Sequence, residues 1–252
     1  MNIPLSDRVE RAIISVLDKK IVASFDDILQ SIFIEFPNAS TPETQDIRRI
    51  LSEYATETTD GKWRLKLQAS LANRQSEHSK MIYLLADLGK KAGFDIWIGT
   101  REQGDSYNGI LLKNLASDID VFKNAPPDVS IQDRIKQIDM LWFSDGCIQY
   151  EFEVEYTTGI SEAIIRGSNI PDDTIKRRFI LVPKERERFL FRKIQEHLLK
   201  ETLKKTKWDF IRFEDLEEMN NTIKKKFNPN LLDQLSRLPV EKNIIQSALS
   251  NF

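Results

Sequence analysis

The sequence has little cysteine, no large excess of charge of one sign and no long hydrophobic run. Its one cysteine, Cys147, cannot form a disulfide within the chain. The 37 Lys and Arg residues against 39 Asp and Glu residues give a formal net charge of -2, so any electrostatic case for nucleic-acid binding must be regional. No charged-then-apolar leader is visible, and no segment is long and apolar enough to cross a bilayer. We therefore expect a reduced, cytoplasmic protein with no membrane partner.

The composition is that of an ordinary globular protein. Hydrophobic residues make up 40% and charged residues 30% of the 252 positions, which is enough for one large domain or two small ones. No internal repeat or low-complexity tract is visible. The polar stretch QASLANRQSEHSK has the character of a linker, and it predicts an amino-terminal domain over residues 1–68 and a second domain over residues 76–252.

The amino-terminal domain is predicted to be helical with a closing hairpin. Apolar residues at helical spacing predict helices over residues 7–20 and 25–33, and a third helix over 41–55 begins with a Ser or Thr cap and a proline. Asp60-Gly61 is a hairpin signal, and the residues after it alternate between basic and apolar. Three helices closed by a basic hairpin resemble a winged helix-turn-helix, with residues 41–55 as the recognition helix.

This resemblance implies a DNA-reading domain with basic contacts on the hairpin and on the recognition helix. The residues expected to touch DNA are Lys62, Arg64, Lys66, Arg48 and Arg49. The same helix also carries acids that weaken its grip on phosphates, namely Glu43, Asp46 and Glu53. The alternative is therefore a domain that mediates protein contacts or buttresses its neighbour.

The second domain is predicted to be α/β, with a mixed sheet flanked by helices. Strand-like segments alternate with helical ones, which favours strands on a covered sheet. The expected strands are 94–100, 137–143, 147–158, 177–183 and 207–216. The expected helices are 77–93, 161–169, 185–205 and a carboxy-terminal tail from 217 onward. Residues 99–130, rich in Gly, Asn, Asp and Pro, are predicted to form a long irregular insertion.

An unusual run of acids lies in the strand that begins at Cys147. Glu151, Glu153 and Glu155 alternate with Ile148, Tyr150, Phe152 and Val154, so the glutamates should share one face and the apolar side chains the other. Asp139 lies in the preceding strand, and a short turn between the two strands should bring it toward Glu153. Buried acids need a compensating cation, and a divalent metal supplies one. The alternative is an ordinary strand with its glutamates in water.

The segments IDMLWF and YEFEVE, preceded by a helix beginning SEHSK, resemble the PD-(D/E)XK nuclease superfamily, the fold of many restriction endonucleases. The resemblance implies that Asp139 and Glu153 bind Mg²⁺, for which Mn²⁺ can substitute. The usual lysine position holds Glu155, an E-x-E variant that implies a carboxylate as the water-positioning base. Glu77 is a further implied ligand, and its neighbour His78 is the rival for that place.

The expected function is a Mg²⁺-dependent endodeoxyribonuclease, of restriction type or serving another defence role. Arg166, Ser168 and Asn169, at the end of the helix after the acidic strand, are expected to grip a phosphate. The alternative is ordinary capping of this helix by Thr158 or Ser161 and by a C-terminal Gly167. Cutting both strands with one site per chain favours a homodimer. The alternatives are a catalytically inactive nuclease-fold protein that binds DNA or regulates, and a second domain that serves only in assembly.

Overall fold

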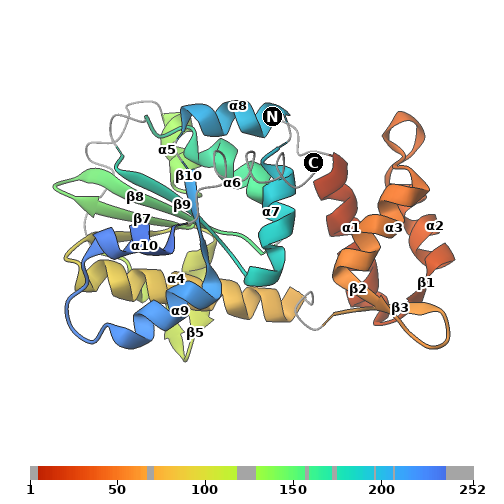
Figure 1. The fold of residues 1–252 in the computed structure, drawn as a ribbon, viewed down its shortest axis with the longest axis horizontal. Helices are drawn as coiled ribbons and strands as arrows, with labels where there is room; N and C mark the ends of the chain where they lie inside the picture. Colours follow the sequence, from red (N-terminus) through yellow and green to blue (C-terminus); the bar gives the residue numbers. More distant parts are fainter. Residues whose placement is uncertain are drawn as a thin grey trace, which may run out of the picture. The chain divides into compact units, whose positions relative to one another are not determined.

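The structure is a computed structural model, and it describes residues 5–66, 71–117, 129–156, 159–171, 175–195, 197–206 and 208–236 (Figure 1). The chain forms two compact units, Met1–Glu77 and His78–Phe252. Among the described helices, none combines the length and the apolar character that a bilayer crossing requires. The helix that joins the two units begins at Leu71, six residues before the predicted start at 77, so most of the expected linker is helical.

The described part of the first unit consists of helices packed on a small antiparallel sheet. Its elements are α1 (Leu5–Lys20), β1 (Ala23–Ser24), α2 (Phe25–Glu35), η1 (Asn38–Ser40), α3 (Thr44–Tyr54), β2 (Ala55–Glu57) and β3 (Lys62–Leu65). The sheet order is β1-β3-β2, so the last strand lies between the other two. Gly61, with φ +74, provides the left-handed residue of the β2–β3 turn, where the sequence predicted a hairpin.

The apolar stripes of the first three helices converge on one core. Ile13 of α1, Ile28 of α2 and Ile47 of α3 are fully buried in it, and Trp63 of β3 covers it from the sheet. Helix α2 begins with a reciprocal capping box, in which the Ser24 and Asp27 side chains each accept a backbone hydrogen bond from the other residue. The apolar stripes are the signal that predicted the helices. The Ser or Thr cap expected at residues 40 or 41 is not formed, because α3 begins at Thr44 with Glu43 as its N-cap and no side-chain cap hydrogen bond.

The second unit is built on a five-stranded mixed sheet in the order β10-β9-β8-β7-β4. Its strands are β4 (Asp95–Ile98), β7 (Met140–Ser144), β8 (Cys147–Val154), β9 (Arg177–Val182) and β10 (Trp208–Arg212). The strands β4, β7 and β8 are antiparallel neighbours, whereas β8, β9 and β10 run parallel. Parallel neighbours need crossover connections, and helices supply them on the way from β8 to β9 and from β9 to β10.

Helices cover both faces of this sheet (Figure 1). On one face the core includes side chains from α4 (Leu71–Lys91), α9 (Phe213–Thr222) and α10 (Leu232–Leu235). On the other face it includes side chains from α5 (Val129–Ile135), α6 (Ile160–Gly167), α7 (Glu187–Lys193) and α8 (His197–Lys205). The predicted mixed sheet flanked by helices is therefore confirmed, and it is compatible with a restriction-endonuclease-like core.

Two predictions, one for a helix and one for the irregular insertion, differ from the structure in detail. The single helix expected over 185–205 is two helices, α7 and α8, with the short helix η5 (Lys184–Arg186) before them. The described part of the insertion after β4 has regular structure, with η3 (Glu102–Gly104), the hairpin β5 (Ser106–Tyr107) and β6 (Ile110–Leu111), and η4 (Leu112–Leu115). Of the tail from 217 onward, residues 237–252 lie outside the described residues, and so do 118–128 of the insertion.

One expectation about the acidic strand fails because of a bulge. Tyr150, Phe152 and Val154 pack in the same core as predicted, but Ile148 packs in the cluster on the opposite face. The register shifts by one residue where Phe143 pairs with Ile148 and Trp142 with Tyr150. An extra residue in one strand inverts the alternation beyond it, and the sequence carried no signal of it.

Candidate metal-binding site

Asp139 lies where β7 approaches the end of β8. The residue after it, Met140, pairs with Phe152, which brings Asp139 level with the last residues of the acidic strand, as the sequence predicted. Its carboxylate is buried, and Oδ2 accepts a hydrogen bond of 2.8 Å from the backbone N–H of Val154. The side chain is thereby fixed in one orientation, with little freedom to turn toward solvent.

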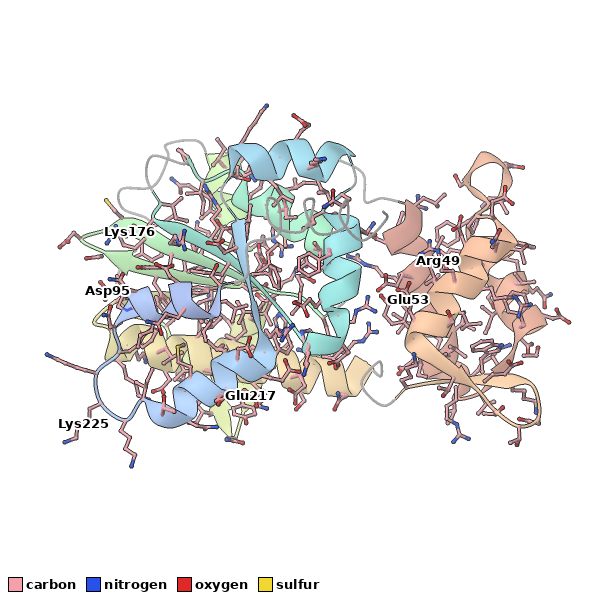
Figure 2. The ribbon with its side chains drawn as sticks, in the orientation of Figure 1. Arg49, Glu53, Asp95, Lys176, Glu217 and Lys225 are labelled. Atoms are coloured by element: carbon pink, nitrogen blue, oxygen red, sulfur yellow. The ribbon has the colours of Figure 1, made fainter. Side chains whose placement is uncertain are left out.

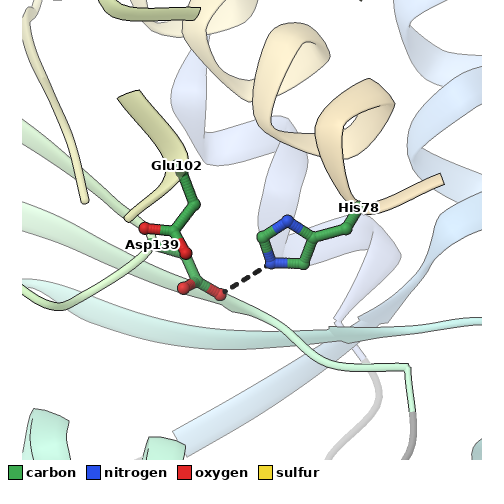
Figure 3. Close-up of side chains that lie close together, drawn as sticks. All are labelled: His78, Glu102 and Asp139. Carbon is green, nitrogen blue, oxygen red and sulfur yellow. Dashed lines mark hydrogen bonds and ion pairs between the residues drawn. The ribbon is translucent and has the colours of Figure 1, made fainter. Parts of the chain in front are cut away.

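Two other elements bring side chains to the same carboxylate (Figure 3). His78 of α4 places Nε2 3.4 Å from Oδ2 of Asp139. Glu102 of η3 is buried beside them, and one potential ligand atom of each of these three residues lies within 4.8 Å of the others. An imidazole nitrogen and two carboxylates at this separation are a donor set that can hold a divalent cation.

The end of β4 is packed tightly against this group. A side chain at Gly99 would place its Cβ 2.3 Å from Oε2 of Glu102 and 2.8 Å from the carbonyl oxygen of Ile138. Glycine at this position therefore lets η3 turn close enough to β7 for Glu102 to lie beside Asp139.

Glu153 is fully buried and binds Arg166 of α6 through both carboxylate oxygens. The Nε–Oε1 distance is 3.0 Å and the Nη2–Oε2 distance is 2.5 Å. The same guanidinium lies 3.9 Å from Oε1 of Glu155. Thus the expected metal ligand Glu153 and the expected phosphate contact Arg166 are partners of each other in this structure, and Glu153 is not among the three residues grouped around Asp139.

Glu155 follows the last residue of β8 and lies close to Gly159, which directly precedes α6. A Cβ at Gly159 would lie 2.0 Å from its Oε1, so the glycine makes room for this carboxylate. Burial, followed by the charge of Asp139, raises the pKa of Glu155 to about 7. A carboxylate with such a pKa can exchange a proton near neutral pH.

The other ionisable groups are perturbed by the same surroundings. Burial, then the charge of Asp139, raises the pKa of Glu102 to about 7. Burial alone would lower the pKa of His78, but the hydrogen bond and charge of Asp139 outweigh it and raise this pKa to about 9. Burial alone would raise the pKa of Asp139, but the hydrogen bond and the charge of His78 outweigh it and hold this pKa below its usual value. These pKa shifts are those of a buried site in which carboxyl groups outnumber basic side chains.

Glu151, the third glutamate of the row, serves a different purpose. Its Oε2 lies 3.1 Å from Nε of Arg178 on β9, and both side chains are buried. Arg178 also donates a hydrogen bond of 2.6 Å to the carbonyl oxygen of Ile170, after α6. This pair ties neighbouring strands to the turn after α6, so the role of Glu151 is structural.

A protein-family comparison matches residues 62–237 to the C-terminal domain of the type II restriction enzyme NmeDI. The chain belongs to this family. The match to the NmeDI C-terminal domain covers all the acids of the site, together with His78 and Arg166. The three helices α1, α2 and α3 precede the matched region. A search among curated proteins found no significant match.

Within the region shared with the NmeDI C-terminal domain, the remaining expected site residues have local contacts. Glu77 precedes His78 on α4 and does not belong to the group around Asp139. Ser168 donates to the carbonyl oxygen of Ile165, and Asn169 donates to the carbonyl oxygens of Ile165 and Arg166. Both side chains therefore cap the end of α6, where Ser168 and not Gly167 is the C-cap residue.

The predicted basic residues of the hairpin have unequal surroundings. Lys66 donates to the carbonyl oxygens of Ser52 and Glu53 at 3.0 and 2.9 Å, so it caps the end of α3. Lys62 forms an exposed ion pair of 3.2 Å with Asp60 in the turn. Arg64 lies exposed on β3 between them.

The two arginines of α3 also have neighbours. The guanidinium of Arg48 lies over the ring of Phe25 at 3.9 Å. Arg49 pairs with Asp46 at 3.2 Å and with Glu53 at 3.7 Å along the same helix (Figure 2). Both arginines are exposed, and surface pairs of this kind are weak enough to be exchanged for a phosphate.

Glu102 is the residue that sequence reasoning missed. It lies in the segment expected to be irregular, and its burial depends on a short helix that apolar periodicity does not reveal. The available signal was an acid four residues beyond Ile98, the last residue of β4, with Gly99 between the two. His78 was weighed only as a rival to Glu77, and the structure brings His78 to Asp139.

The Arg166–Glu153 pair leads to a stability prediction. We expect Arg166→Ala to lower the free energy of unfolding by about 3 to 5 kcal/mol, because Glu153 would remain buried without its compensating charge. Chemical denaturation measures this loss. The control is Arg134→Ala, an exposed arginine of the same unit, for which we expect a change within about 0.5 kcal/mol. Equal small losses in both variants would contradict the importance of the pair.

The raised pKa of Glu155 leads to a second prediction. In metal-free buffer, the stability of the wild-type protein should fall as pH rises from about 5 to about 8, and less so in Glu155→Gln. A carboxyl whose folded pKa exceeds its unfolded value contributes stability that is present below the unfolded pKa and lost as pH rises through the folded pKa of about 7. Thermal melts across this range measure the difference.

The exposed Glu35→Gln provides the control for the loss of a glutamate of the first unit, and its curve should follow that of the wild type. Parallel curves for Glu155→Gln and the wild type would mean that Glu155 does not titrate in this range.

Proposed function

We propose that this protein is a divalent-metal-dependent DNA endonuclease of the PD-(D/E)XK type, acting as a restriction or other defence nuclease. The observation that carries the proposal is the convergence of His78, Glu102 and Asp139 at the end of β8, in a chain of the NmeDI C-terminal domain family. The site also holds Glu153 and Glu155, and its carboxylates outnumber its two basic side chains, Arg166 and His78. A divalent cation would compensate this excess of negative charge.

The residues that would hold the metal are Asp139, Glu102 and His78. Their oxygen and nitrogen donors fit a divalent ion, because the two carboxylates suit Mg²⁺ or Mn²⁺ and the imidazole is a donor that transition ions accept. A bound ion would supply Lewis-acid polarisation of a phosphate oxygen and would acidify a neighbouring water. This assignment replaces the expected ligands Glu153 and Glu77 with Glu102 and His78, and keeps Asp139.

The remaining steps, proton transfer and orientation of the reacting groups, are assigned to side chains of the protein. Glu155, with a pKa of about 7, is the base that accepts the proton of the attacking water. Arg166 keeps Glu153 compensated and lies close to Glu155, so it orients the acidic strand end toward the reacting phosphate. Asp139 is held in place by the hydrogen bond from the Val154 N–H, and His78 and Glu102 lie around its carboxylate.

We propose that the first unit reads DNA as a winged helix. The order α1, β1, α2, α3, β2, β3, with the last two strands as an antiparallel hairpin, supports this proposal. Helix α3 exposes polar and basic side chains suited to base edges and phosphates, namely Gln45, Arg48, Arg49 and Ser52. Arg64 would be the phosphate contact of the hairpin. A homodimer, with one site for each DNA strand, is part of the same proposal.

The hairpin can be tested with two single variants. We expect Arg64→Ala to weaken DNA binding and to reduce the slope of log affinity against log salt by about one, because one phosphate contact is lost. Lys66→Ala should instead lower stability while leaving the slope nearly unchanged, since its ammonium caps α3. Fluorescence anisotropy at several salt concentrations gives both slopes. Equal slope changes in the two variants would contradict the division of roles.

The second candidate function is a catalytically inactive nuclease-fold protein that binds DNA. The observation that favours it is the pairing of Glu153 with Arg166, which engages one of the two acids that the nuclease pattern requires. Incubation with mixed-sequence DNA and Mg²⁺ or Mn²⁺ separates the two functions. Cleavage that EDTA prevents supports the endonuclease. Tight DNA binding without cleavage in either metal supports the inactive protein.

A further inference from the structure

A basic cluster lies at the far end of α4 from the candidate site. The loop between α9 and η6 (Pro229–Leu231) contains Lys224, Lys225 and Lys226, and all three are exposed. Lys90, in the last turn of α4, is exposed as well. Within the described part of the chain, none of these four lysines forms an ion pair. Lys225 projects away from the body of the unit (Figure 2).

The loop is held firmly against α4, so the position of its lysines is defined. Lys91 donates a hydrogen bond of 3.0 Å to the carbonyl oxygen of Ile223, and the N–H of Phe227 donates to the carbonyl oxygen of Lys91 at 3.2 Å. The ring of Phe227 is buried, with its centroid 6.3 Å from that of Trp142. The three lysines therefore lie between Ile223 and Phe227, both of which are hydrogen-bonded to Lys91.

The acid closest in sequence to this junction does not neutralise the cluster. Asp87 pairs with Lys91 at 2.6 Å, and that lysine also binds the loop backbone. Lys91 is therefore the structural cation of the junction, whereas Lys90 and the three loop lysines present their charges to solvent. In a chain with a formal net charge of -2, four such neighbouring charges form a local positive surface that can attract a polyanion.

From these observations we propose that Lys90 and Lys224–Lys226 form a contact surface for the DNA backbone outside the cleavage site. This inference rests on the proposed function. Lys90 lies twelve positions after His78 on α4, which at a rise of about 1.5 Å per residue is a distance of about 18 Å along the helix. A duplex that ran along α4 from the site would present phosphates about five base pairs away to the cluster.

Lysine contacts of this kind are independent of sequence. An ammonium on a flexible stem binds phosphate as a point charge and does not make the planar paired hydrogen bonds that arginine makes with a base. The cluster would therefore add affinity and fix the direction of the duplex, while base recognition would take place elsewhere.

The test is a triple variant in the full-length protein, Lys224→Gln with Lys225→Gln and Lys226→Gln. Binding to a mixed-sequence duplex of about 30 base pairs is measured in Ca²⁺, over salt concentrations from about 50 to 200 mM. We expect the slope of log affinity against log salt to become shallower by about two to three units, and affinity to fall at least about tenfold at the lower salt concentrations.

The matched control replaces three exposed lysines from separate elements, Lys113, Lys184 and Lys205, with glutamine. It makes the same change in net charge, and its slope should stay within about half a unit of the wild type. Equal slopes in the wild type and the loop variant, or equal changes in loop variant and control, would overturn the inference and leave the nuclease proposal standing. A wild-type protein that binds no DNA would overturn both. Binding of the cluster to anionic lipid vesicles, with DNA binding unaffected by the variant, would assign this surface to a membrane instead.

Discussion

Asp139→Asn is expected to reduce DNA cleavage by about a thousandfold or more and to remove the rise in melting temperature that Mg²⁺ or Mn²⁺ produces in the wild type. Asp139 is the carboxylate shared by the whole site, since it contacts His78, accepts the Val154 N–H and lies beside Glu102. Asparagine keeps the size of the side chain and one accepting oxygen but loses the charge that a cation requires. Several kcal/mol of metal-ion stabilisation correspond to this change in rate.

Single-turnover cleavage and thermal melts with and without metal measure the two effects. Asp145→Asn is the matched control, because the same chemical change is made in the exposed turn of the same hairpin, where a positive φ of 54 suits asparagine. We expect this control to cleave and to respond to metal as the wild type does. Full activity in Asp139→Asn would refute the site.

Glu155→Gln is expected to slow cleavage by about a hundredfold to ten-thousandfold while DNA affinity in Ca²⁺ remains unchanged. Glutamine preserves the size and hydrogen-bonding reach of the side chain but cannot accept the proton of the attacking water. The loss should therefore appear in the rate of the chemical step and not in binding. Single-turnover cleavage beside an anisotropy titration separates the two quantities.

The exposed Glu185→Gln serves as the control for the loss of a carboxylate elsewhere in the second unit, and it should retain the wild-type rate. If Glu155→Gln also cut at the wild-type rate, the base would be another group, with His78 the first candidate because its Nε2 lies 3.4 Å from Oδ2 of Asp139.

The fold was largely predictable because its signals are local. Apolar periodicity identified the five strands of the sheet, and the Asp60-Gly61 pair marked the turn of the β2–β3 hairpin. The misassigned parts depend on tertiary packing. The bulge that places Ile148 on the opposite face changes no residue type, and the division between α7 and α8 interrupts a continuous amphipathic pattern.

The site was predictable only where chain neighbours form it. Asp139 and the glutamates of β8 belong to one hairpin, so strand periodicity and a short turn predicted their proximity. Glu102 and Arg166 arrive from a short helix and from a crossover helix, and their positions follow from how these elements pack on the sheet. Consequently the acid that groups with Asp139 was missed, and the cation that binds Glu153 was expected to bind phosphate.

The most direct test of the metal site is anomalous diffraction from crystals of the full-length protein soaked in Mn²⁺. Our account predicts a peak about 2.0 to 2.5 Å from ligand atoms of Asp139, Glu102 and His78, with Arg166 still bound to Glu153. No peak beside Asp139, or a peak held by Glu153 with Arg166 displaced, would contradict it.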